Sequence, residues 1–206
     1  MIRNVIFDIG MVLAHFRYRE YMQELQFTSE QIEAVTAHMI FNPLWNEFDR
    51  AARPFSDVLN EMKAQHPDET DLYDRFWADP TRLCISFPDT REWLLGLKQR
   101  GYHLYLLSNY PEDLFQRHWK STFTFTDLVD GKVISYAEKL TKPEAGIYQV
   151  LFDRYHLNPA ESIFLDDRAE NIEAAGKLGL RGIVVGDREK AKEELEEVLE
   201  EGGQNR

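Results

Sequence analysis

Four short apolar runs, each rich in β-branched residues, constrain the fold of this 206-residue chain more than any other feature. Each lacks the regular alternation of apolar and polar residues that marks a strand with one face in water, so each is interpreted as a strand buried on both faces. Strands of that kind occur in parallel sheets that helices cover on both sides. The runs are NVIFD (4–8), YHLYLLSN (102–109), SIFLDD (162–167) and RGIVVG (181–186).

Helical patterns alternate with the later strands. Apolar residues recur at helical spacing over residues 88–101, 142–157 and 169–180, and Gly101 stands where a helix C-terminus favours glycine. The charged C-terminal run predicts a last, solvated helix that frays at Gly202. The alternation of strand and helix predicts an α/β fold with a doubly wound, Rossmann-like parallel-sheet core.

The interval between the first and second strands has a different pattern, with helical periodicity and no convincing strand. Its helical patterns lie around residues 18–25, 28–40, 55–66 and 68–78. Thr28 and Gln31 have the spacing of a capping box. We therefore expect a four-helix cap over residues 15–86, inserted into a core made of residues 1–14 and 87–206.

Composition and charge narrow the classes of partner and compartment. The net charge of −12 argues against nucleic acid or an anionic membrane as a partner, because both bind through basic patches. No run approaches the roughly 18 apolar residues of a membrane span, and Met1 leads directly into a strand pattern without an export signal. The single cysteine, Cys84, cannot form an internal disulfide and is interpreted as a small buried hydrophobe. We expect a soluble, cytoplasmic protein whose oligomeric state the sequence does not indicate.

Polar residues stand at the predicted strand ends and in one loop: Asp8; Ser108 and Asn109; Asp166 and Asp167; and Lys142 in the connection LTKPE. Ligands of an open parallel sheet gather at the carboxyl ends of its strands. Three carboxylates that converge there repel one another unless a cation lies among them. Mg²⁺ suits such a place, because it binds one or two carboxylates together with water and phosphate oxygens. The sequence therefore predicts a magnesium site at this edge of the sheet.

In order and spacing, these residues resemble the four motifs of the haloacid dehalogenase superfamily of aspartyl-phosphate hydrolases. The resemblance covers nearly the whole chain, and the helical insertion resembles the small four-helix cap of that superfamily. It implies that Asp8 attacks phosphorus and that Lys142 neutralises both Asp8 and the transferring phosphoryl group. It also implies that the Ser108 hydroxyl and the backbone N–H groups around Asn109 bind the phosphate.

For the metal, the resemblance implies that Mg²⁺ binds Asp8, the Gly10 carbonyl oxygen and Asp167. Asp166 would lie further from the ion, although these two aspartates could exchange roles. Asn171 stands where many relatives have another aspartate, and it could hydrogen-bond the metal's water or Lys142.

Gly10 is the main departure from the superfamily pattern. Most of its phosphatases carry a second aspartate there, which protonates the leaving group and then activates water, a contribution of about 10²–10⁴-fold. Three interpretations follow: a phosphatase whose acid is supplied elsewhere or scarcely needed, a pseudoenzyme that binds phosphate or a partner, or a 2-haloacid dehalogenase. Asp8 and Lys142 favour the first, and the superfamily's dehalogenases lack the Asp166–Asp167 pair.

The expected partner is a small phosphorylated metabolite. The chain resembles a glycine-variant branch that includes sugar-1-phosphate phosphatases, so a sugar 1-phosphate is one expected substrate. Trp45 and Phe48 are candidates to pack on a sugar face, with the core of the cap as an equally consistent location. Candidate groups for bonding hydroxyls are Asn46, Glu47, Asp49 and Arg50. His15 is a candidate to approach the leaving group, with packing at a hinge as the alternative.

Overall fold

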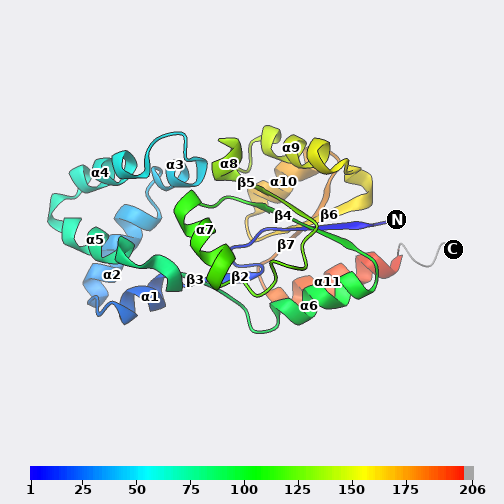
Figure 1. Cartoon of the computed structure of the whole chain (residues 1–206), viewed down its shortest axis with the longest axis horizontal. Coiled ribbons are helices and arrows are strands. Elements are labelled where there is room, and N and C mark those ends of the chain that lie inside the picture. Colours follow the sequence, from blue (N-terminus) through cyan, green and yellow to red (C-terminus); the bar gives the residue numbers. More distant parts are fainter. Residues whose placement is uncertain (202–206) are drawn as a thin grey trace.

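The computed structural model describes residues 1–201 and contains the expected parallel sheet (Figure 1). Within this range five strands pair in the order β5-β4-β1-β6-β7, all parallel. In the central register, Asn4 of β1 lies opposite His103 of β4 and Ser162 of β6. The strands are β1 (Asn4–Phe7), β4 (His103–Ser108), β5 (Gly131–Ile134), β6 (Ser162–Asp166) and β7 (Arg181–Val184). The predicted α/β fold class is confirmed.

The sequence pattern does not predict β5. This strand pairs only with β4, at one edge of the sheet, and its sequence GKVI begins with two half-buried residues. A four-residue edge strand needs apolar residues over only part of its length. Its pattern is therefore too short and too polar to be distinguished from a loop.

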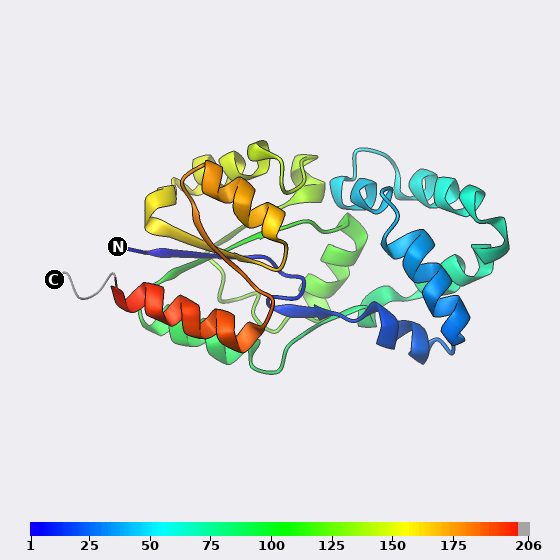
Figure 2. The same cartoon turned by 180° about the vertical axis from the view of Figure 1, so that it is seen from behind.

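Helices cover both faces of the sheet (Figure 1, Figure 2). Val5 and Phe7 of β1 pack in the apolar cluster that includes α6 and α11, whereas Ile6 packs in the cluster that includes α9 and α10. Burial on both faces explains why the strands are continuously apolar. The helices of the core are α6 (Thr90–Gln99), α7 (Glu112–Ser121), α8 (Ser135–Glu138), α9 (Ala145–Tyr155), α10 (Ala169–Lys177) and α11 (Arg188–Glu201), with a 3₁₀ turn at Pro159–Glu161.

Helix ends in the core follow the sequence signals, although α9 and α10 are shorter than predicted. Gly101, at φ 89°, lies just past α6 in the left-handed region that glycine adopts without strain. Helix α9 begins at Ala145 rather than at Lys142, because the preceding residues form a loop that enters the site. The predicted end of the last helix at Gly202 lies outside the described residues. Among the helices of the part that is described, none is both long and apolar enough to cross a membrane.

Within residues 15–86, all of which are described, five α-helices take the place of the expected four. The periodicity does not predict α3 (Trp45–Arg50), because six residues make fewer than two turns. Helix α2 continues as the π-helical segment Thr36–Ile40, and the capping box of Thr28 and Gln31 is confirmed. The other elements are α1 (Tyr18–Glu24), α2 (Ser29–Val35), α4 (Phe55–Gln65) and α5 (Thr70–Ala78), with 3₁₀ turns at Pro67–Glu69 and Pro80–Arg82.

Two strands where the sequence predicts none join the cap to the core. β2 (Ala14–Phe16) and β3 (Cys84–Ser86) form an antiparallel pair, in which His15 lies opposite Ile85. With three residues each, they are too short to show strand periodicity. Both views show α1–α5 gathered at the end of the molecule toward which β1 runs (Figure 1, Figure 2). The division of the chain at residues 14 and 86 stays a prediction.

Candidate active site

The carboxyl edge of the sheet brings the predicted site residues together. Asp8 follows β1, and its backbone N–H donates to the Leu165 carbonyl oxygen at 2.8 Å, which continues the pairing of β1 with β6 by one residue. Asp166 ends β6, and Ser108 ends β4. Because β4, β1 and β6 are neighbours in the sheet, these three residues lie side by side at its edge.

A buried ion cluster lies at the centre of this edge. The Lys142 ammonium group is 3.0 Å from Asp8 Oδ1 and 2.5 Å from Asp166 Oδ2, and the lysine side chain is 1% exposed. Burial opposes the charge of Lys142, but the two carboxylates outweigh burial and raise the pKa of Lys142 above its ordinary value. Burial also raises the pKa of Asp8, although the Lys142 charge opposes this. Lys142 is thus a fixed positive charge beside Asp8.

Asp166 is occupied with other groups besides Lys142. Its fully buried side chain accepts hydrogen bonds from the Arg168 backbone N–H at 2.8 Å and from the Asn171 amide at 2.9 and 3.0 Å. Asn171 therefore bonds Asp166, not Lys142 itself. With both of its oxygens engaged, Asp166 is suited to hold Lys142 in position.

Asp167 is in the opposite situation. Its carboxylate has no hydrogen bond to the side chain of another residue among 1–201. Burial, together with the charges of Asp8 and Asp166, raises the pKa of Asp167 to about 7. One oxygen from each of these three aspartates lies within 4.8 Å of the others. A divalent cation would relieve this surplus of negative charge, and carboxylate oxygens are the ligands that Mg²⁺ prefers. The residues therefore fit a hard divalent cation.

Ser108 and Asn109, adjacent in sequence, have different environments. The Ser108 hydroxyl is buried and has no hydrogen-bond partner among the described residues, so it is available to an oxygen of a bound ligand. The Asn109 side chain accepts a hydrogen bond from the Lys142 backbone N–H at 2.8 Å and donates one to the Lys142 carbonyl oxygen at 3.0 Å. Asn109 thus fixes the loop that carries Lys142, a role that the sequence does not predict.

Gly10 lines the site without a conformational need for glycine. Its backbone is not in the left-handed region, and a Cβ built there would have no heavy atom within 4 Å. A residue with a Cβ at this position is therefore compatible with the backbone and with the neighbouring atoms.

A cavity of about 140 Å³ lies between cap and core. Asp8, Gly10, Asn109 and Asp167 line it from the core, and Trp45 and Asp49 line it from the cap. Much of the remaining wall is apolar or aromatic: Met11, Phe16, Leu83, Tyr110, Pro111 and Leu114. Cys84 also lines it, and burial raises the pKa of its thiol to about 12, so it is a neutral buried group as predicted. This volume suits a ring-sized organic group, since roughly 150 Å³ is enough for benzene.

Two cap residues lie away from the cavity. Among the described residues that line it, His15 is absent: this side chain stacks on Phe87, with ring centroids 5.8 Å apart. Phe48 is 2% exposed and packs against Phe55 and Trp77 in the core of the cap. The packing alternatives are therefore correct for both residues. Trp45 is the aromatic side chain of the predicted pair that reaches the cavity.

Hydrogen bonds that we call the latch tie α3 of the cap to the core beside Lys142. In the latch, Arg50 donates to the Lys139 carbonyl oxygen (3.1 Å), to Thr141 Oγ1 (3.1 Å) and to Glu144 Oε1 (2.5 Å). Ser135 Oγ donates to the Asp49 carbonyl oxygen (2.5 Å), and Lys139 Nζ donates to the Ala51 carbonyl oxygen (2.6 Å). Arg50, expected from the sequence to bond substrate hydroxyls, is thus engaged with the core. Sequence reasoning missed the latch, because Arg50 and Glu144 are 94 positions apart.

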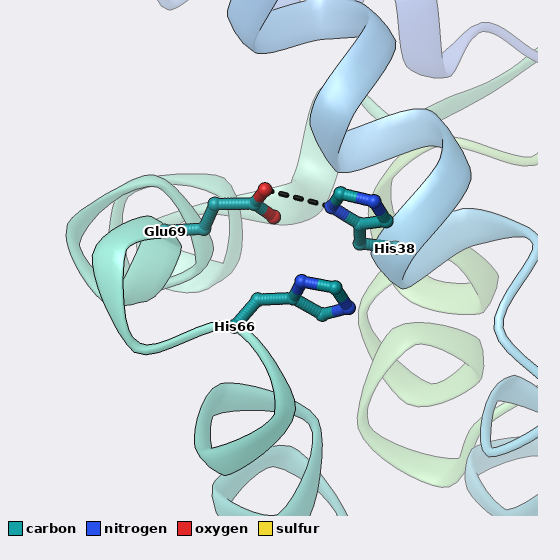
Figure 3. A group of neighbouring side chains, drawn as sticks. All are labelled: His38, His66 and Glu69. Carbon is teal, nitrogen blue, oxygen red and sulfur yellow. Dashed lines mark hydrogen bonds and ion pairs between the residues drawn. The ribbon is translucent and has the colours of Figure 1, made fainter.

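A second group of side chains with metal-ligand chemistry lies in the cap (Figure 3). His38 Nδ1 is 2.7 Å from Glu69 Oε1, and the rings of His38 and His66 stack with centroids 3.8 Å apart and planes 4° apart. An imidazole nitrogen offers its lone pair in the plane of the ring, and a single ion cannot lie in two parallel planes stacked face to face. We therefore interpret this group as packing and hydrogen bonding between cap elements.

The geometry indicates a ligand-binding active site. A carboxylate held beside a buried ammonium group lies in a covered cavity at the carboxyl edge of a doubly wound sheet, where such sheets bind their ligands. Comparison with known families identifies the family of enzymes. The family described as haloacid dehalogenase-like hydrolase matches residues 2–179, and the chain belongs to this family. The resemblance seen in the sequence motifs is confirmed.

Relatives in this family include phosphatases and dehalogenases. The sesquiterpene phosphatase astK of Aspergillus oryzae is 31% identical over 184 residues, 88% of each chain. The D-ribitol-5-phosphate phosphatase of Bacteroides thetaiotaomicron is 30% identical over 191 residues, 87% of this chain and 89% of that one. The (S)-2-haloacid dehalogenase 4A of Burkholderia cepacia is 31% identical over 116 residues, 56% of this chain and 49% of that one.

Solved structures show the same fold. A haloacid dehalogenase-family enzyme of Bacteroides thetaiotaomicron, in complex with magnesium and inorganic phosphate, is 20% identical with a TM-score of 0.69, over 91% of this chain and 96% of that one. A dehalogenase is 24% identical with a TM-score of 0.72, over 90% and 85%. At these identities the likeness shows the fold alone.

Proposed function

We propose that this protein is a magnesium-dependent phosphatase that hydrolyses a small phosphomonoester through an aspartyl-phosphate intermediate. The arrangement of Asp8 carries the proposal. Lys142 and the Ile9 backbone N–H both contact Asp8 Oδ1, at 3.0 and 2.7 Å. Both contacts fall on Oδ1, so we assign the attack to Oδ2. A carboxylate that is oriented by two donors in this way is a nucleophile in position.

In the proposed reaction, Asp8 Oδ2 attacks phosphorus, the bond from phosphorus to the leaving oxygen breaks, and water then hydrolyses the aspartyl-phosphate. Lys142 remains charged and offsets the negative charge that gathers at Asp8. The Ser108 hydroxyl donates to a phosphate oxygen. Asp166 holds the side chain of Lys142, and Asn109 holds its backbone.

Asp8, the Gly10 carbonyl oxygen and Asp167 would hold Mg²⁺. When bound, the ion supplies positive charge that lets a phosphate dianion approach the carboxylate. We choose Asp167 over Asp166 as the direct ligand, because Asp167 has a free carboxylate and Asp166 already bonds Lys142 and Asn171. The fold relative crystallised with magnesium and inorganic phosphate supports this choice of ion.

We expect Asp167→Ala to weaken magnesium binding by about 100-fold or more, because it removes a direct ligand. Asp166→Ala should weaken it less and should act mainly through the position of Lys142. Calorimetry and magnesium titration of activity would measure both effects. His38→Ala, in the stacked group of the cap, is the control and should leave the magnesium constant unchanged. Equal magnesium affinity in Asp167→Ala and the parent would refute this ligand set.

The cavity wall favours an organic group with an apolar face. Trp45, Leu83 and Leu114 contribute to this wall, and Asp49 is the carboxyl group that the cap adds. The relative named as a sesquiterpene phosphatase supports phosphates of apolar alcohols as the first candidate substrates. Sugar 1-phosphates are the second candidate, favoured by Gly10, because an anomeric hydroxyl leaves with less proton transfer.

A panel of phosphomonoesters tests the proposed function. Geranyl phosphate, glucose 1-phosphate, glucose 6-phosphate and ribitol 5-phosphate differ in the polarity and acidity of the alcohol. We expect magnesium-dependent release of inorganic phosphate that EDTA abolishes, with kcat/KM at least about tenfold higher for the apolar ester than for the sugar esters. Full activity in chelator, with chloride released from a 2-haloacid, would indicate a dehalogenase. Phosphate binding without turnover of any ester would indicate a pseudoenzyme.

A further inference from the structure

Hydrolysis of an alkyl phosphate requires a proton for the leaving oxygen, because an unprotonated alkoxide is a poor leaving group. A positioned acid typically contributes about 10²–10⁴-fold to such a step. Gly10 has no side chain to supply it. We infer that Asp49, on α3 of the cap, is the proton donor, an inference that rests on the proposed phosphatase function.

The position of Asp49 is the first observation. Asp49 is 8% exposed and lines the same cavity as Asp8, with Asp8 on the core side and Asp49 on the cap side. The Asp49 carboxyl group makes no hydrogen bond to another residue among 1–201. Buried carboxyl groups are normally hydrogen-bonded. A free one in the wall of a ligand cavity is available to the ligand, and Asp49 reaches this cavity from the cap whereas the nucleophile reaches it from the core.

Elimination of the other titratable groups is the second observation. Besides Asp49, those that line the cavity are Asp8, Asp167, Cys84 and Tyr110. Asp8 is the nucleophile, Asp167 is assigned to the cation, and the Cys84 thiol is weakly acidic because it is buried. The Tyr110 hydroxyl donates a hydrogen bond to His118 Nδ1 at 2.7 Å, since His118 Nε2 donates its own hydrogen bond to the Pro80 carbonyl oxygen at 3.1 Å. Asp49 is the remaining acid.

The protonation of Asp49 agrees with this role. Burial, the largest cause, and the neighbouring charge of Asp8 raise the pKa of Asp49 to about 8, against the opposing charges of Lys142 and Arg168. The raised pKa favours the protonated carboxyl group, the form that a proton donor needs. A cation bound at Asp8 would offset the contribution of Asp8 and leave that of burial in place.

The latch holds this acid in place. Ser135 Oγ donates to the Asp49 carbonyl oxygen at 2.5 Å, and Arg50, the next residue, pairs with Glu144 at 2.5 Å. The donor is thus fixed relative to Lys142 only while α3 is docked on the core. Closing of the cap would complete the set of catalytic groups.

Asp49 gives up a proton in the first half of the reaction and regains one in the second. As the Asp8–phosphorus bond forms and the ester bond breaks, the leaving oxygen takes the proton of Asp49, and the alcohol departs. Water then attacks the aspartyl-phosphate and gives a proton to the Asp49 carboxylate. Inorganic phosphate leaves, and Asp8 is again a carboxylate. With this donor, the lack of an acid at position 10 no longer restricts the enzyme to acidic leaving groups.

Substituted phenyl phosphates test the inference, because they keep one shape while the acidity of the leaving phenol changes. For Asp49→Asn we expect kcat/KM to fall about 100-fold or more with unsubstituted phenyl phosphate, and by less than about threefold with para-nitrophenyl phosphate. The slope of log kcat/KM against phenol pKa should steepen accordingly. Asp49→Ala, which also lacks the acid, should show the same steepening if the asparagine variant folds poorly.

Two further variants separate proton donation from a structural role. Gly10→Asp in the Asp49→Asn background should restore much of the activity toward phenyl phosphate, since it places a carboxyl group beside Asp8 and a Cβ at position 10 meets no heavy atom within 4 Å. Asp57→Asn, an exposed carboxyl in the cap, should keep the parent slope. An equal loss with every phenyl phosphate, or no loss, would overturn the role of Asp49 while the phosphatase function stands. A parent protein that hydrolyses none of these esters would instead refute the proposed function.

Discussion

Asp8→Asn should reduce kcat by about 10⁴-fold or more, because removal of a nucleophile abolishes the covalent route. The amide oxygen can still accept hydrogen bonds from Lys142 and the Ile9 backbone N–H, which both contact Oδ1 in the parent. The amide nitrogen that replaces Oδ2 cannot attack phosphorus. Phosphate release measures the loss, and thermal unfolding followed by circular dichroism measures the fold.

Asp153→Asn is the matched control for this change. Asp153 is an exposed carboxyl on α9 that bonds Gln149, so its amide variant should retain the activity of the parent. An Asp8→Asn protein that turns over at the parent rate would show that Asp8 is not the nucleophile. The proposed mechanism would then be abandoned.

Lys142→Met should inactivate the enzyme and also lower the free energy of unfolding by about 3–5 kcal/mol, the usual effect of removing one partner from a buried ion pair. The Lys142 side chain is 1% exposed, and its ammonium group lies between Asp8 and Asp166. Methionine has a similar length but no charge, so it leaves these two carboxylates buried and facing each other. Urea unfolding measures the stability, and phosphate release measures the activity.

Lys98→Met provides the comparison for this loss of stability. Lys98 pairs with Asp130 at 2.7 Å, but both side chains are partly exposed, and such pairs contribute about 1 kcal/mol or less. We expect this variant to retain its activity and nearly all its stability. Equal stability losses in the two lysine variants would mean that the cluster around Lys142 is not effectively buried.

The central strands of the fold could be predicted from sequence because burial on both faces gives them continuous apolar runs. β1, β4, β6 and β7 all lie within the predicted ranges. The edge strand β5, the short pair of β2 and β3, and the six-residue helix α3 could not be predicted. These elements are stabilised by contacts with distant parts of the chain, and they are too short to carry a periodic pattern of their own.

Part of the candidate site could likewise be predicted from the sequence, and part could not. The gathering of Asp8, Ser108 and Asp166 at one edge follows from their places at strand ends. The bonds that orient Lys142 could not be predicted, because Asn109 and Asp166 reach it across 33 and 24 positions. Asp49 was visible in the sequence only as one of several polar residues in the cap. Its burial at the cavity depends on the docking of α3, which no local pattern reveals.

The most direct test of the account is to locate the phosphoryl group during turnover. Acid quenching followed by borohydride reduction converts an aspartyl-phosphate to homoserine, which mass spectrometry of the N-terminal peptide can assign to a residue. We predict homoserine at position 8 in the parent protein with magnesium and substrate, and none in Asp8→Asn or in EDTA. Turnover with no modification at position 8, or with the phosphoryl group on another residue, would contradict the account.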